Sequence, residues 1–278
     1  MEFRTPQGQE RYDALAAAAP EVLVGLDFDG TLSPIVDDPD RAVIHPDGPR
    51  VLTALASRVR AVVVVTGRPA RQVVDLGDLD RVADGLPDGA RLVVMGQYGN
   101  ERWDASSREF TSPEPPAGLR AFRDELPRLL KAERAEGAHI EEKGLAVAVH
   151  TRRLPDPAAA FARLEEALAD AAERHGLSLE PGRLVLEVRA PGMHKGLALE
   201  TAVAEHDAGG VLFAGDDLGD LPAFSAVEQL RTEGVPGITV ASASDEAPDV
   251  AARADLVLAG PDGVVQLLIS LAAAIGNG

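Results

Sequence analysis

The stretch VLVGLDFDGTLSPIV, residues 22–36, joins an apolar run to two acids. Residues 22–26 are apolar throughout, which is typical of a buried strand in a parallel sheet, and Asp27 and Asp29 follow almost at once. Two carboxylates this close repel each other unless a cation lies between them. Since parallel sheets carry their chemistry beyond the carboxyl ends of the strands, the stretch predicts an α/β fold with a site at that edge.

The same alternation of strand and helix patterns continues on both sides of a central break. Further strands are expected within RAVVVVTGR (60–68), RLVVMG (91–96), GGVLFAG (209–215) and GITVA (237–241), and helices from Gly48 and within GVVQLLISLAAAI (263–275). Strands that alternate with helices predict a parallel sheet covered on both faces, in a Rossmann-like core.

The pattern changes near residue 113, after which the Pro-rich segment SPEPPAG begins an insert. A helix (119–135), two strand-like runs (139–143 and 145–151), a second helix (157–175) and another strand pair (177–180 and 183–189) follow in order. This order predicts an α+β insert with an antiparallel sheet. We therefore expect a core of residues 1–112 and 190–278 and an inserted domain of residues 113–189.

The composition excludes several classes of function. The chain has 278 residues, of which 27 are Lys or Arg and 45 are Asp or Glu, so its net charge is −18. Such an acidic chain is not expected to bind nucleic acid or an anionic membrane. Cysteine is absent, and we find neither a signal-peptide pattern nor an 18-residue apolar run. We expect a cytoplasmic monomer that binds neither nucleic acid nor membrane.

Polar residues follow three of the expected strands. Asp27 and Asp29 follow the first, Thr66 follows the second, and Asp216, Asp217 and Asp220 follow GGVLFAG. An all-oxygen donor set without His or Cys suits Mg²⁺, which takes about six oxygens at roughly 2.0–2.1 Å. The sequence therefore predicts a Mg²⁺ site where a phosphate could also bind.

The two acids of the first stretch suit different tasks. An ionised carboxylate beside Mg²⁺ can attack phosphorus, which suits Asp27, and a second carboxyl can protonate the leaving group and later activate water, which suits Asp29. Gly30 allows a sharp turn that brings backbone N–H groups to the phosphate. Taken singly, each feature has a commoner structural explanation, such as a helix N-cap for Thr66 or a solvated helix residue for Lys195. The joint order carries the prediction.

That order resembles the haloacid dehalogenase superfamily of phosphatases. Asp27, Asp29 and Thr31 match its first motif, Thr66 its second, Lys195 its third, and Asp216, Asp217 and Asp220 its fourth. The resemblance implies a haloacid dehalogenase core, Mg²⁺ and an aspartyl-phosphate. It also implies that Thr66 and Lys195 bind the phosphoryl group, and that Lys195 offsets the charge of Asp27. Asp216 would bind Mg²⁺ with Asp217 or Asp220 in support, and the backbone carbonyl of Asp29 would complete the set.

The resemblance narrows to the trehalose-6-phosphate phosphatases. LDFDGTLSPIV, TGRP, GQYGNER, EEKGLAVAVHTR and GRLVLEVRAPGMHKGLAL are similar to segments of that family, in the same order. This implies hydrolysis of trehalose 6-phosphate in trehalose biosynthesis, with the insert as a cap. Substrate contacts are expected from Gly30, Gly67, Arg68 and Glu101 of the core and from Glu141, Lys143, His150, Arg152 and Glu187 of the cap, since charged groups bind sugar hydroxyls well.

Some positions depart from the family pattern. Gly219 and Leu221 replace its usual Thr and Glu, Tyr98 stands where His is usual, and Thr151 where Tyr is usual. Two alternatives therefore stay open. One is a phosphatase for another sugar phosphate, such as sucrose 6-phosphate, and the other is a non-catalytic module that binds a sugar phosphate and regulates a partner.

Overall fold

The structure is a computed structural model that describes residues 2–36, 38–182, 184–243 and 248–276. It divides into two compact units, Met1–Ser112 with His194–Gly278, and Pro113–Met193. The second unit thus extends to Met193, whereas the sequence analysis ends the insert at residue 189. Because the chain enters and leaves the insert between elements of the first unit, the first unit is built from both ends of the sequence.

The first unit is built on a mixed sheet. Its strands, in spatial order, are β1 (Glu2–Phe3), β13 (Leu256–Leu258), β12 (Gly237–Ser242), β11 (Gly210–Gly215), β2 (Val22–Leu26), β3 (Ala61–Val65), β4 (Leu92–Gly96), β5 (Glu101–Asp104) and β6 (Phe110–Thr111). From β13 to β4 neighbouring strands are parallel. The parallel arrangement was predicted for β12, β11, β2, β3 and β4, whereas β13 was not expected. The antiparallel strands at the two edges, β1, β5 and β6, were also not expected from the sequence.

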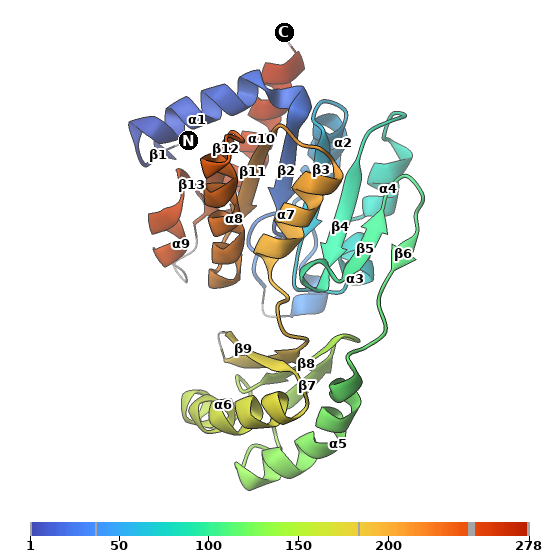
Figure 1. Ribbon diagram of the computed structural model, residues 1–278, viewed down its shortest axis with the longest axis vertical. Helices are drawn as coiled ribbons and strands as arrows, with labels where there is room; N and C mark the ends of the chain where they lie inside the picture. Colours follow the sequence, from blue (N-terminus) through green and yellow to red (C-terminus); the bar gives the residue numbers. More distant parts are fainter. Residues whose placement is uncertain (1, 37, 183, 244–247, 277–278) are drawn as a thin grey trace. The chain divides into compact units, whose positions relative to one another are not determined.

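Helices cover both faces of this sheet (Figure 1). One face packs against α1 (Pro6–Ala17), α2 (Gly48–Ala56), α3 (Ala70–Leu76), α4 (Leu79–Asp84) and α10 (Gly260–Gly276), and the other against α7 (Lys195–Glu205), α8 (Leu221–Thr232) and α9 (Pro248–Arg253). Successive strand residues alternate between the faces, so Val24 packs on the first and Leu23 on the second. The predicted α/β core is confirmed.

The second unit is a four-stranded antiparallel sheet with two helices on one face (Figure 1). The strand order is β7 (His139–Glu142), β8 (Ala146–His150), β10 (Val185–Arg189) and β9 (Ser178–Gly182), and the helices are α5 (Ala117–Ala132) and α6 (Pro157–Arg174). Leu186 and Val188 of β10 pack under the helices, so Glu187 and Arg189, which alternate with them, lie on the opposite face. The predicted order of strand pair, helix and strand pair is confirmed.

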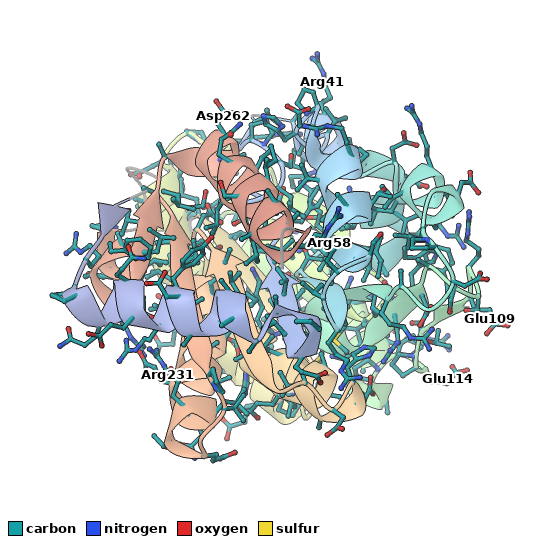
Figure 2. All side chains as sticks on the ribbon, turned by 90° about the horizontal axis from the view of Figure 1, so that it is seen from above. Arg41, Arg58, Glu109, Glu114, Arg231 and Asp262 are labelled. Atoms are coloured by element: carbon teal, nitrogen blue, oxygen red, sulfur yellow. The ribbon has the colours of Figure 1, made fainter. Side chains whose placement is uncertain are left out.

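Charged side chains lie mainly at the surface. Arg41, Glu109 and Asp262 are exposed and project outward from the first unit (Figure 2). None of the helices in the described ranges combines the length and the apolar character needed to cross a bilayer. A few charged groups are buried instead, and most of those in the first unit lie near the carboxyl ends of its central parallel strands.

Candidate active site

Three adjacent parallel strands present the core of the site. The order β11–β2–β3 is continuous in the sheet, and Asp216, Asp27 and Thr66 each directly follow the last residue of one of these strands. Parallel strands end at the same edge, so residues from distant parts of the sequence meet there. All three side chains belong to residues that are at most 5% exposed.

Lys195 joins two of the acids. It is the first residue of α7, whose N-cap His194 accepts a hydrogen bond from the backbone of Leu197 through its ring Nδ1. The buried Nζ of Lys195 donates to Asp27 Oδ1 at 2.6 Å and to Asp220 Oδ1 at 2.7 Å. One ammonium therefore bridges the first and the fourth sequence motifs.

Asp220 also shapes the loop after β11. Its second oxygen, Oδ2, accepts hydrogen bonds from the backbone N–H groups of Asp216 at 2.9 Å and Asp217 at 3.1 Å. The loop continues as the short 3-10 helix η4 (Leu218–Asp220), in which the side chain of Asp217 caps the N–H of Asp220. Asp217 itself is exposed, whereas Asp220 is fully buried.

Three carboxylates are close enough to share one cation. Asp27, Asp216 and Asp220 each offer an oxygen, and these oxygens lie within 4.8 Å of one another. Hard divalent cations such as Mg²⁺ and Ca²⁺ prefer oxygen donors of this kind, so the donor set fits the expected metal. The side-chain carboxylates of Asp29 and Asp217 lie outside this group. Metal binding by the backbone carbonyl of Asp29 stays a prediction.

Burial makes this cluster costly to ionise without a cation. It raises the pKa of Asp216 to about 8, with help from the charges of Asp220 and Asp217, and that of Asp220 to about 6. Burial likewise raises the pKa of Asp27 well above its usual value, although Lys195 opposes the shift. For Lys195, burial lowers the pKa, but the attraction of Asp220 and Asp27 outweighs it, and the pKa lies well above its usual value. The lysine stays charged, and a metal would stabilise the ionised acids.

The loop after β3 reaches the other acid of the first motif. Arg68 donates through Nε to Asp29 Oδ2 at 2.6 Å and through Nη2 to Asp29 Oδ1 at 2.7 Å. Arg68 N–H also donates to Thr66 Oγ1 at 3.1 Å. Thr66 and Arg68, two of the expected site residues, are thus connected within one loop, and an ion pair that was not anticipated from the sequence joins Asp29 to it.

The segment after β4 supports this loop. A Cβ on Gly67 would lie 2.7 Å from the hydroxyl of Tyr98, so the tyrosine occupies the space beside Gly67. Glu101, an expected substrate contact, accepts a hydrogen bond from the N–H of Ala70 at 2.7 Å and so holds the start of α3. Its predicted contact with substrate stays a prediction.

Two buried hydroxyl groups add to the site. Ser242, the last residue of β12, donates to the carbonyl oxygen of Gly30 at 2.6 Å. The hydroxyl of Thr31 is fully buried and has no hydrogen-bond partner within the described ranges. Ser242 was not predicted, although a hydroxyl residue directly after an expected strand was a usable signal.

A separate polar cluster lies on the sheet of the second unit, on the face opposite its helices. Lys143 Nζ donates to Glu187 Oε2 at 2.7 Å, and Arg189 Nη1 donates to Glu187 Oε1 at 3.0 Å. His150 Nε2 lies 2.9 Å from Glu141 Oε2. Four of the five expected cap residues therefore form two pairs: Glu141 and His150 join the neighbouring strands β7 and β8, whereas Lys143, just after β7, reaches Glu187 on β10 across β8. Arg189 joins the second pair.

The fifth expected cap residue behaves differently. Arg152 lies just beyond β8 and is exposed. Arg189, which was not expected, is 5% exposed and also lies 3.6 Å from Glu180 on β9. Its position two residues after Glu187 on one strand was the available signal, since residues i and i+2 of a strand share a face.

Comparison with known proteins gives a consistent result. A family model described as trehalose-phosphatase matches residues 25–262. The chain is 30% identical over 228 residues to a probable trehalose-phosphate phosphatase of Sinorhizobium fredii, which covers 80% of each chain. It is 29% identical to the trehalose-6-phosphate phosphatase of Escherichia coli, over 73% of each chain.

A solved structure has the same fold. The C-terminal domain of the C. albicans trehalose-6-phosphate phosphatase superposes with a TM-score of 0.74, over 96% of each chain and at 21% identity. At that identity the likeness concerns the fold alone. The sequence relatives and the family model carry the assignment.

Proposed function

The chain belongs to the trehalose-phosphatase family, a family of phosphoric monoester hydrolases, and from this premise we propose that it hydrolyses trehalose 6-phosphate to trehalose and inorganic phosphate. The observation that carries the proposal is the contact of Lys195 with both Asp27 and Asp220, which supports Asp27 as the nucleophile beside a metal-binding loop. Sucrose 6-phosphate remains the comparison substrate, because Gly219 and Leu221 depart from the family pattern.

In the proposed first step, Asp27 attacks the phosphorus atom of the substrate. A new P–O bond forms to the Asp27 carboxylate, the P–O bond to the sugar breaks, and the sugar oxygen takes a proton from Asp29. Lys195 offsets the negative charge that gathers on Asp27 and the phosphoryl oxygens. Thr66 and the backbone near Gly30 and Gly67 are proposed to bind those oxygens.

In the second step, water attacks the phosphorus atom of the aspartyl-phosphate. Asp29 accepts the proton of the water, the P–O bond to Asp27 breaks, and inorganic phosphate leaves. We propose that the metal is Mg²⁺, held by Asp27, Asp216 and Asp220 with the backbone carbonyl of Asp29, and with Asp217 nearby. When bound, it would stabilise charge on the phosphoryl group.

We propose that the second unit confers specificity for the sugar. Its cluster of Glu141, Lys143, His150 and Glu187, with Arg152, offers charged donors and acceptors of the kind that bind sugar hydroxyls. Lys143 and Glu187 are the strongest candidates, since both are largely buried and already paired. The cytoplasmic location and the monomeric state expected from the sequence stay predictions.

The test is phosphate release from trehalose 6-phosphate, sucrose 6-phosphate, glucose 6-phosphate and 4-nitrophenyl phosphate. Each would be measured with Mg²⁺, with chelator, and with Asp27→Asn, which removes the nucleophile at nearly constant shape. Asp88→Asn, at an exposed position, is the matched control. We expect Mg²⁺-dependent release from trehalose 6-phosphate that only Asp27→Asn abolishes. Phosphate release from sucrose 6-phosphate alone would overturn the proposed substrate. Full activity of Asp27→Asn would overturn the proposed mechanism.

A further inference from the structure

The two side chains of Arg68 and Asp29 form a bidentate pair. Both carboxylate oxygens of Asp29 accept an N–H of Arg68, at 2.6 and 2.7 Å. The planar guanidinium matches the plane of a carboxylate, so such a pair fixes orientation as well as distance. The side chain of Arg68 is 13% exposed and that of Asp29 is 40% exposed. Arg68 is thus the more buried partner and the one better placed to fix the orientation of the other.

Arg68 is itself held at several points. Its third guanidinium nitrogen, Nη1, donates to the carbonyl of Pro39 at 2.9 Å, in the loop that follows the first motif. Its backbone N–H donates to Thr66 Oγ1, and its carbonyl accepts from the N–H of Gln97 at 2.9 Å. The arginine is therefore fixed through both its backbone and its side chain before it contacts Asp29.

The supporting turn is strained. Gln97 and Tyr98 have φ angles of 48° and 58°, in the left-handed region that non-glycine residues avoid. Such residues cost about 1–3 kcal/mol each and persist only where surrounding structure holds them. The N–H of Tyr98 donates to the carbonyl of Thr66 at 2.9 Å, so the strained turn bonds to the loop on both sides of Gly67. A turn of this kind is a rigid support for Arg68.

We propose that Arg68 is a positioning residue that holds the Asp29 carboxylate as the base for hydrolysis of the aspartyl-phosphate. The inference rests on the proposed function of Asp29. Each carboxylate oxygen can accept two hydrogen bonds, so each keeps one acceptor site after bonding Arg68. In the step concerned, the water oxygen bonds to phosphorus, a water proton moves to Asp29, and the electrons of the broken P–O bond return to Asp27.

The pair suits this step better than the earlier one. Both oxygens of Asp29 accept an N–H group of Arg68 and each keeps one acceptor site, so the carboxylate is held in one orientation while it can still accept a proton from water. The arginine should consequently matter most for the second step of the reaction.

The test separates the two steps with 4-nitrophenyl phosphate, whose leaving group needs no proton. Rapid mixing records the burst of 4-nitrophenolate from the first step and the steady rate that follows. Arg68→Gln should lower the steady rate about tenfold or more while the burst rate changes less than about threefold, since misplacing a catalytic group is costly. Acid quenching should reveal accumulated phosphoenzyme. Arg81→Gln, an exposed arginine, is the matched control.

Two further variants make the inference falsifiable. Asp29→Asn should show the same burst with a steady rate lowered about 10²- to 10⁴-fold, and Arg68→Gln should add little to it. An equal loss in burst and steady rate, or a higher KM at unchanged kcat, would instead assign Arg68 to substrate binding and overturn the inference. Because the aryl substrate reports on the steps directly, failure to hydrolyse trehalose 6-phosphate would overturn the proposed substrate separately.

Discussion

The backbone of Gly30 lies directly against the carboxylate of Asp216. A Cβ built on Gly30 would lie 2.1 Å from Asp216 Oδ2, far inside van der Waals contact, and Gly30 has a φ of 68°. The carbonyl of the same glycine accepts the hydroxyl of Ser242. The first motif therefore touches the fourth through a residue that has no side chain, and this contact sets where the Asp216 carboxylate can lie.

Gly30→Ala should consequently displace Asp216 and weaken metal binding by at least about tenfold, a loss of about 1.4 kcal/mol. Gly89→Ala is the matched control, because Gly89 also has a positive φ but a Cβ there would meet nothing within 4 Å. Alanine is disfavoured at a positive φ in both variants, but only at Gly30 does its Cβ also clash with Asp216. The difference in Mg²⁺ affinity between the two variants, measured by isothermal titration, therefore reports the clash. Equal affinities in the two variants would contradict the close contact.

Lys195→Met should destabilise the protein. It removes the ammonium that pairs with Asp27 and Asp220 and leaves buried carboxylates without that countercharge. Breaking a buried pair in this way costs about 3–5 kcal/mol. Urea unfolding in the presence of chelator measures the loss, and added Mg²⁺ should restore part of it. Arg50→Met, which removes an exposed pair with Asp47, should change the stability much less.

Stability without metal should fall as the pH rises. The folded protein holds protons on Asp216 and Asp220 more tightly than the unfolded chain, because burial raises the two pKa values to about 8 and about 6. The free energy of unfolding without metal therefore decreases as the pH rises from about 4 to 8. A bound cation favours the ionised acids, so the increase in Tm on adding Mg²⁺ should grow over the same range. Calorimetry in chelator and in Mg²⁺ measures it, and a pH-independent increment would contradict it.

Glu125 should stabilise the second unit in a pH-dependent manner. Hydrogen bonds from His175, Arg128 and Arg174 lower its pKa to about 2. A lowered pKa gives stability that is present above the unfolded value near 4.5 and is lost as the pH falls toward 2. Glu125→Gln should therefore lower Tm at pH 7, and the difference should vanish near pH 2. Glu166→Gln, at an exposed position of α6, should show no such dependence.

The strands that carry the chemistry could be predicted because each is a short apolar run that ends at a polar residue. Residues 22–26 and 61–65 are wholly buried strands, followed at once by Asp27 and Thr66. The antiparallel edge could not be predicted in the same way. β5 has four residues and β6 has two, which is too short to show the alternation of apolar and polar residues that marks a strand. Their pairing depends on the turn between them.

The contacts within the site were less predictable than its members. Asp29 and Arg68 are 39 residues apart, and the loop that carries Arg68 is hydrogen-bonded to a left-handed turn at Gln97 and Tyr98 that no local signal in the sequence marks. Asp29 and Arg68 could be named from sequence motifs, but their pairing could not. Asp217 could likewise be named from its motif, but its position could not be predicted. The motif places it among the metal ligands, whereas its carboxylate lies outside the three-carboxylate group.

The two outermost strands of the large sheet, β1 and β6, have a consequence for assembly. Each is only two residues long and antiparallel to its neighbour. An edge strand exposes unpaired backbone groups to which another chain can add, and a strand of two residues offers very little of this template. The parallel strands of the first unit are thus shielded at both margins, so strand exchange and fibril-like stacking between copies should be disfavoured even at high protein concentration.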